Sequence, residues 1–178
     1  MKFKKRTYKN IKDFLYDLWF PIRNRKRLRE VRNKGLLSPA FQERIMLAVT
    51  SVEGCRYCSY FHSKLALKGG VSQEEINKLL SGEVKGCPEE EALAVLYAQH
   101  WAESNACPDK DAAERLEETY GPEKAEAINL MLRMIRLGNL LGNTWDYLLY
   151  RISFGKWHMI DKRGKKPIYQ KARTGDRK

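Results

Sequence analysis

The sequence predicts an all-α domain with a Cys-x-x-Cys motif at the N-terminus of one helix. Apolar residues recur every three to four positions over long stretches, as they do in helices that bury one face. No stretch alternates apolar and polar residues between turn signals in the way that a half-buried strand does. At 178 residues, the chain is long enough to form one domain with a substantial core.

Charge divides the chain into three parts. Residues 1–34 carry a net charge of +10 and residues 151–178 carry +8, whereas the whole chain carries only +12. The part between them is therefore mildly acidic. This pattern predicts a basic N-terminal arm over 1–34, a helical domain over 35–153 and a basic C-terminal tail over 154–178.

The N-terminal arm is expected to contain one short amphipathic helix over 8–20, which ends before Pro21 and is followed by a basic linker over 23–34. Its aromatic face is expected to pack on the domain or on a neighbouring subunit. Two interpretations of the basic arms stay open. They are solvated extensions, or they make weak contact with an anionic surface such as a membrane or a nucleic acid, although they contain no recognisable nucleic-acid-binding motif.

Capping residues, prolines and glycines divide the remaining sequence into helices. The expected helices cover residues 38–54, 55–69, 72–80, 88–104, 108–121 and 123 into the 150s. Ser72 and Glu75 form the pattern of a capping box at the start of the third of these. Gly138 and Gly142 lie inside the last helix, at a spacing that suits either a close helix approach or a kink.

The candidate functional residues are centred on Cys55, Cys58 and His62, which project from one face of the helix that follows Gly54. Two thiols and an imidazole in this arrangement suit thiol chemistry or metal binding. The position of Cys55 near a helix N-terminus favours a thiolate. His62, four residues beyond Cys58, is spaced to take the proton of that thiol.

Glu43 lies on the preceding helix. If the two helices form a hairpin at Gly54, its carboxylate lies level with His62 and can orient the imidazole or relay its proton. Three aromatic neighbours are expected to keep the site partly dry: Tyr57, Tyr60 and Phe61.

Other roles for the cysteines are less favoured. Zinc would need Cys55, Cys58, His62 and Glu43 together, but side chains at i and i+7 on one rigid helix lie about 10 Å apart along its axis. We therefore expect no metal ligands, and burial of the pair as two small apolar residues is equally disfavoured.

The other two cysteines, Cys87 and Cys107, are separated by a helix of about 25 Å and are not expected to form a disulfide. Four cysteines are too few for a disulfide scaffold, and no apolar run approaches the ~20 residues that span a bilayer. A cytoplasmic enzyme is therefore expected.

The pattern Glu43-x11-Cys55-x2-Cys58-x3-His62 resembles the signature of alkylhydroperoxidase D (AhpD)-like proteins in the carboxymuconolactone decarboxylase superfamily. The resemblance covers roughly residues 36–153. It implies an AhpD-like helical bundle that assembles into a homo-oligomer, a trimer or a hexamer. It also implies that Cys58 attacks the peroxide and becomes a sulfenic acid, that Cys55 resolves it as a disulfide, and that His62 and Glu43 relay protons.

The same resemblance implies a peroxide or disulfide substrate, no bound cofactor, and an external dithiol reductant of the lipoyl or thioredoxin type. One residue departs from the family pattern, because Tyr57 stands where the best-known peroxidases carry histidine. The departure leaves a general thiol–disulfide oxidoreductase as an alternative, and a binding or sensor protein recruited by the basic arms is another. The helix dipole alone favours Cys55 as the nucleophile, whereas the resemblance favours Cys58.

Overall fold

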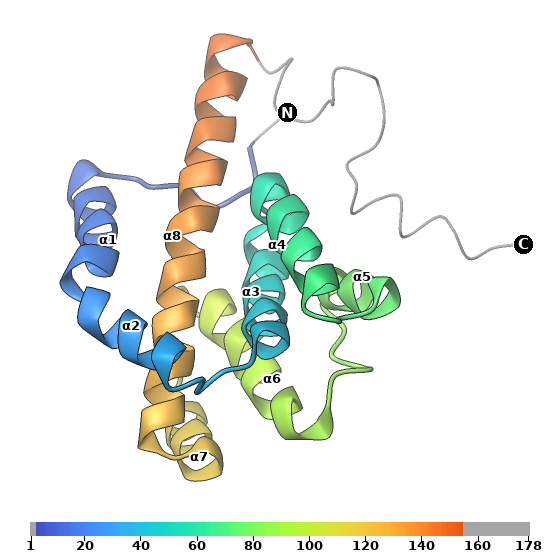
Figure 1. The fold of residues 1–178 in the computed structure, drawn as a ribbon. Helices are drawn as coiled ribbons and strands as arrows, with labels where there is room; N and C mark the ends of the chain where they lie inside the picture. Colours follow the sequence, from blue (N-terminus) through green and yellow to red (C-terminus); the bar gives the residue numbers. More distant parts are fainter. Residues whose placement is uncertain (1–2, 155–178) are drawn as a thin grey trace, which may run out of the picture.

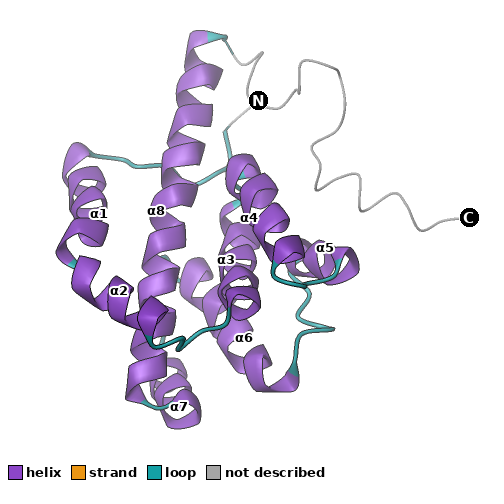
Figure 2. Ribbon diagram, viewed as in Figure 1, coloured by secondary structure: helices purple, strands orange, loops and turns teal. Residues whose placement is uncertain are grey.

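The computed structural model describes residues 3–154, and this part of the chain contains eight helices and no strand (Figures 1 and 2). The all-α prediction is confirmed. The helices are α1 (Ile11–Arg23), α2 (Arg25–Asn33), α3 (Pro39–Glu53), α4 (Arg56–Lys68), α5 (Gln73–Ser81), α6 (Glu89–Glu103), α7 (Lys110–Tyr120) and α8 (Pro122–Ile152). The C-terminal tail predicted over 154–178 lies, apart from its first residue, outside the described residues.

Helix α3 is the centre of the fold and packs against α4, α5, α6 and α8 (Figure 1). Ile45, Leu47 and Val49 on this helix are fully buried, which explains its central position. Its ends are where the sequence predicts them. The Ser38 hydroxyl accepts the backbone N–H of Phe41, and α3 stops at Gly54, whose φ of 71° is left-handed.

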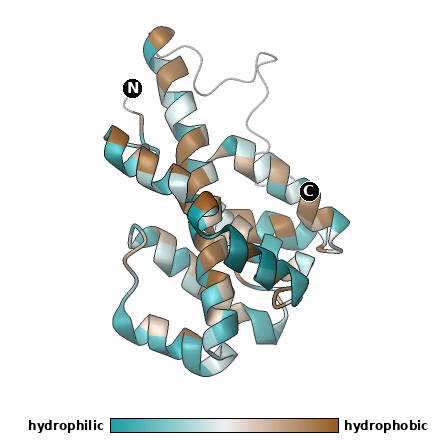
Figure 3. Ribbon diagram, turned by 60° about the vertical axis from the view of Figure 1, so that its left-hand side comes forward, coloured by the Kyte–Doolittle hydropathy of each residue, from teal (hydrophilic) through white to brown (hydrophobic). Residues whose placement is uncertain are grey.

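Helix α8 runs the length of the molecule and contacts α1, α3, α4 and α7. Its C-terminal end extends beyond the other helices (Figure 1). Hydrophobic residues recur on this projecting end (Figure 3), and Trp145, Leu148 and Ile152 are largely exposed there. None of the helices in residues 3–154 has both the length and the apolar content needed to cross a membrane.

A buried ionic cluster fastens α5 and α6 to α3. The Arg44 guanidinium contacts Glu75 at 2.5 Å and Glu91 at 3.0 Å, and all three side chains are largely buried. The Ser72 hydroxyl accepts the Glu75 backbone N–H, as the capping-box pattern predicts. The Glu75 carboxylate, however, turns to Arg44 rather than back to the helix start.

The N-terminal arm differs from the prediction, because it folds as two helices on the body. Helix α1 begins after Asn10, which caps it, and continues through Pro21 to Arg23. Proline removes only one helical hydrogen bond, and the helix continues past it because Phe20 is buried under the Arg133 guanidinium of α8.

The expected basic linker is also helical, and it forms α2. Burial of Val31 and two ion pairs with α8, Arg27 to Glu126 and Lys34 to Glu123, hold this segment against the bundle. These tertiary contacts stabilise a helix in a segment whose high charge indicated a solvated linker.

Candidate redox site

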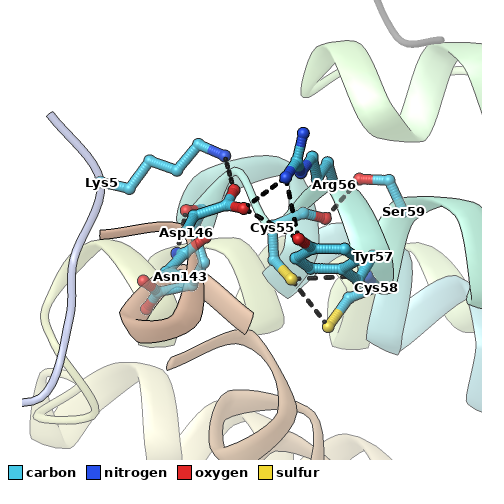
Figure 4. A network of polar contacts seen from close by, with 9 residues as sticks. Lys5, Cys55, Arg56, Tyr57, Cys58, Ser59, Asn143 and Asp146 are labelled. Atoms are coloured by element: carbon cyan, nitrogen blue, oxygen red, sulfur yellow. Dashed lines mark hydrogen bonds and ion pairs between the residues drawn. The ribbon is translucent and has the colours of Figure 1, made fainter. Parts of the chain in front are cut away.

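The cysteine motif lies at the tight turn between α3 and α4 (Figure 4). Cys55 is the N-cap of α4, and its sulfur accepts the backbone N–H of Cys58 at 3.4 Å. The two Sγ atoms are 3.1 Å apart and both cysteines are free thiols. Because a disulfide bond is about 2.05 Å long, closing one here needs about 1 Å of movement.

The two thiols differ in acidity and in exposure. The hydrogen bond from the Cys58 thiol lowers the pKa of Cys55 to about 7 against the effect of burial, and the Lys5 charge and nearby backbone N–H groups contribute. The pKa of Cys58 is raised because its thiol is the donor in that hydrogen bond and is itself partly buried. Cys55 is completely buried, whereas Cys58 is partly exposed.

Glu43 and His62 meet as the predicted hairpin between α3 and α4 requires. His62 Nδ1 lies 2.7 Å from a carboxylate oxygen of Glu43, and both side chains are mostly buried. A carboxylate accepts hydrogen bonds, so Nδ1 donates and Nε2 is the nitrogen left to accept a proton. In the described part of the chain, no hydrogen bond joins His62 to either cysteine. The site therefore consists of two adjacent pairs, one of thiols and one of histidine and carboxylate.

Two glycines of α8 form the wall behind the cysteines. A Cβ atom on Gly142 would lie 2.6 Å from the Cys55 sulfur and 3.2 Å from a ring carbon of Tyr57. A Cβ atom on Gly138 would lie 3.7 Å from the Cys58 sulfur. Of the two roles that the sequence allowed for these glycines, the structure shows the close approach.

Asp146 binds the residues between the two cysteines (Figure 4). This fully buried carboxylate accepts from Arg56 at 2.8 Å, from the Tyr57 hydroxyl at 3.1 Å and from Lys5 at 3.1 Å. Burial raises the pKa of Tyr57, so its phenol stays protonated. Sequence reasoning missed the roles of Lys5 and Arg56. The position of Asp146 at the site could have been inferred from the sequence. It lies one helical turn after Gly142, on the face of α8 that packs against the cysteine turn.

The buried amides of α8 make polar contacts with α3. Asn139 hydrogen-bonds to Thr50, and Asn143 donates to the backbone carbonyl of Glu53 at 2.9 Å. The buried Glu53 carboxylate is paired with Arg6 at 3.4 Å, and burial raises its pKa despite this partner. These contacts fix α8 against the cysteine turn.

The expectation that three aromatic rings keep the site dry is wrong for this chain by itself. Tyr57, Tyr60 and Phe61 are 41%, 50% and 58% exposed. Only Tyr57 reaches the site, where its hydroxyl donates to the buried Asp146 and its ring lies against Gly142. It is the close approach of α8 that excludes solvent from Cys55.

The remaining cysteines and histidines lie elsewhere. Cys87 and Cys107 are free thiols, and His100 contacts Asp109 at 3.2 Å near the surface. His158 lies outside the described residues. Among residues 3–154, no three His, Cys, Asp or Glu side chains are arranged to hold a metal ion.

Comparison with known proteins bears on this site. Searches of curated proteins and of solved structures found no match. The model of the carboxymuconolactone decarboxylase family, which includes AhpD-like proteins, matches residues 21–98. The match begins inside the predicted basic arm, ends within α6, and contains Glu43, Cys55, Cys58 and His62. The chain is therefore similar to the carboxymuconolactone decarboxylase family over residues 21–98.

Proposed function

We propose that this protein is a thiol-dependent redox enzyme that reduces peroxides through a sulfenate–disulfide cycle of Cys58 and Cys55. The observation that carries the proposal is the pair of free thiols with sulfurs 3.1 Å apart at a helix N-terminus. The Glu43–His62 pair lies one helical turn beyond and supplies a proton relay. No bound cofactor is needed, because the electrons come from an external dithiol.

In the first step, the Cys58 sulfur attacks one oxygen of the hydroperoxide. An S–O bond forms, the O–O bond breaks, and the alcohol leaves with the thiol proton, which His62 and Glu43 deliver. Cys55 then attacks the sulfenic acid of Cys58, forming the disulfide and releasing water. A dithiol partner of the lipoyl or thioredoxin type reduces this disulfide by two exchanges and is itself oxidised.

Acidity and exposure favour different cysteines as the first nucleophile. The lowered pKa favours Cys55, but its sulfur is completely buried and out of contact with a peroxide. Cys58 is the accessible thiol, and its proton can pass to the sulfur of Cys55 at 3.1 Å. We assign the first attack to Cys58 because the nucleophile must touch the oxygen that it attacks.

A turnover assay tests the proposed function. The purified protein is incubated with an alkyl hydroperoxide or a disulfide substrate, and with dihydrolipoamide or reduced thioredoxin as donor. We expect peroxide consumption that depends on the dithiol, and a disulfide between Cys55 and Cys58 in peptide mass spectra after peroxide treatment without donor. The absence of both results would contradict the proposal.

Tyr57 supports a second candidate function, that of a general thiol–disulfide oxidoreductase. Its protonated phenol is bound to Asp146 and Arg56, so no imidazole stands directly before Cys58. The same assay separates the two functions. Disulfide reduction without peroxide turnover would favour this second candidate.

We also propose a homo-oligomer, a trimer or a hexamer, in the reducing cytoplasm. The support is apolar surface beside the site that the single chain leaves uncovered. Phe61 and Tyr60 on α4, Trp145 on α8 and Trp19 on α1 are each at least half exposed. A second copy that covers α4 would shield the cysteine turn from water.

The acidity of Cys55 gives a pH prediction. Because its pKa is lowered to about 7, the thiolate forms as pH rises through 7 rather than through about 9. We expect thiolate absorbance at 240 nm to rise with a midpoint near pH 7 and to lose this phase in Cys55→Ser. Lys5→Met should move the midpoint upward, because the removed positive charge stabilises the thiolate. A midpoint near pH 9 in the unsubstituted protein would contradict this prediction.

A further inference from the structure

The basic segment that precedes α1 is folded onto the body at three points. Lys5 pairs with Asp146 at 3.1 Å, Arg6 pairs with Glu53 and donates to the carbonyl of Glu103, and the Tyr8 backbone N–H donates to Thr144. The segment therefore forms a wall of the molecule instead of a free cationic arm.

Between this wall, α1, the end of α6 and α8 lies a cavity of about 840 Å³. Six of the lining side chains are cationic and two are acidic. The cationic ones are Lys4, Lys5, Arg6, Lys9, Arg133 and Arg136, and the acidic ones are Asp13 and Asp17. Tyr8, Tyr16 and Trp101 add aromatic surface to the lining.

The two acidic residues offset part of this positive charge, and both make other contacts. Asp13 accepts from the side-chain amide of Asn10 at 2.8 Å. Asp17 accepts from the Tyr8 hydroxyl at 2.9 Å and lies 3.6 Å from Arg136. Lys4, Lys9 and Arg133 have no carboxylate partner among residues 3–154. Lys4 and Lys9 thus have no ion pair in this part of the chain, and Arg133 is held only by the stacking of its guanidinium on Phe20.

Arg136 adds a donor inside the protein. One of its terminal nitrogens donates to the Asn105 side chain at 2.8 Å, but its buried Nε has no hydrogen-bond partner in the described chain. Because this Nε is closed off from solvent, a ligand can reach Arg136 only through the exposed part of its guanidinium. An anionic oxygen is the strongest acceptor for a guanidinium.

We propose that this cavity binds a small molecule that carries two or more phosphate or carboxylate groups. Its volume is in the range of small-molecule sites. The cations gather in a recess rather than along a ridge, which suits a compact anion better than a polymer. The proposal is independent of the thiol chemistry. Two lining residues also contact the surroundings of the cysteine turn, Lys5 through Asp146 and Arg6 through Glu53, and neither is substituted in the test.

Isothermal titration calorimetry at low ionic strength tests the proposal, with inorganic pyrophosphate and citrate as probes. We expect one site per chain for at least one probe, and the two probes distinguish phosphate from carboxylate recognition. The double variant Lys9→Gln/Arg133→Gln should bind about tenfold more weakly or worse. If it is unstable by circular dichroism, Lys9→Gln alone should still weaken binding severalfold.

Lys26→Gln/Arg29→Gln is the matched control. It removes the same charge from exposed positions of α2 that do not line the cavity, and it should bind as the unsubstituted protein does. Equal losses in both double variants would mean that only net charge matters and would overturn the proposal. It would also be overturned if neither probe binds, or if single-stranded DNA binds and pyrophosphate fails to displace it.

Discussion

Replacing Cys58 by serine is expected to abolish thiol-dependent turnover, with kcat lower by about three orders of magnitude or more. Serine keeps the size of the side chain, but its hydroxyl neither attacks the peroxide at neutral pH nor forms a disulfide. Cys55→Ser should also stop turnover, yet it should leave the first oxidation intact. A dimedone-type probe should therefore trap a sulfenate on Cys58 in the Cys55→Ser variant.

Cys107→Ser is the control for these variants, because Cys107 is an exposed free thiol outside the site and its loss should leave turnover unchanged. The opposite labelling pattern would reverse the assignment. That pattern is a sulfenate on Cys55 in Cys58→Ser, together with none on Cys58 in Cys55→Ser. It would mean that the acidity of Cys55, rather than the exposure of Cys58, selects the nucleophile.

Gly142→Ala is expected to damage both the site and the stability of the protein. A new Cβ would lie 2.6 Å from the Cys55 sulfur, so the cysteine turn or α8 must shift. Alanine in a helix interior normally stabilises it by about 1 kcal/mol relative to glycine. Here overpacking of about 1–3 kcal/mol opposes this gain. We expect a lower free energy of unfolding in urea and at least a tenfold loss of turnover.

Gly138→Ala is the matched comparison on the same face of α8. Its Cβ would meet the Cys58 sulfur at 3.7 Å, which is ordinary van der Waals contact. This variant should therefore keep its turnover and gain some helix stability. If Gly142→Ala is as stable and as active as Gly138→Ala, the close approach of α8 does not shape the site.

Local sequence signals were sufficient for most helix boundaries. Ser38, Gly54 and Ser72 are capping residues whose effect depends on neighbouring backbone groups alone, and each helix end lies where they predict. The N-terminal arm was predicted less well. Its two helices depend on the packing of Phe20 under Arg133 and on the ion pairs Arg27–Glu126 and Lys34–Glu123, which join residues distant in the chain and which no local pattern encodes.

The sequence by itself determined the motif chemistry. Two thiols and an imidazole at helical spacing, with Glu43 on the helix before them, predicted the thiol pair and the Glu43–His62 contact. Both follow from the helical repeat and one tight turn at Gly54. Only the tertiary structure decided what surrounds this motif. Asp146, Gly142 and Lys5 reach the cysteine turn through the packing of α8 and the N-terminal segment, because burial and acidity depend on groups distant in the chain.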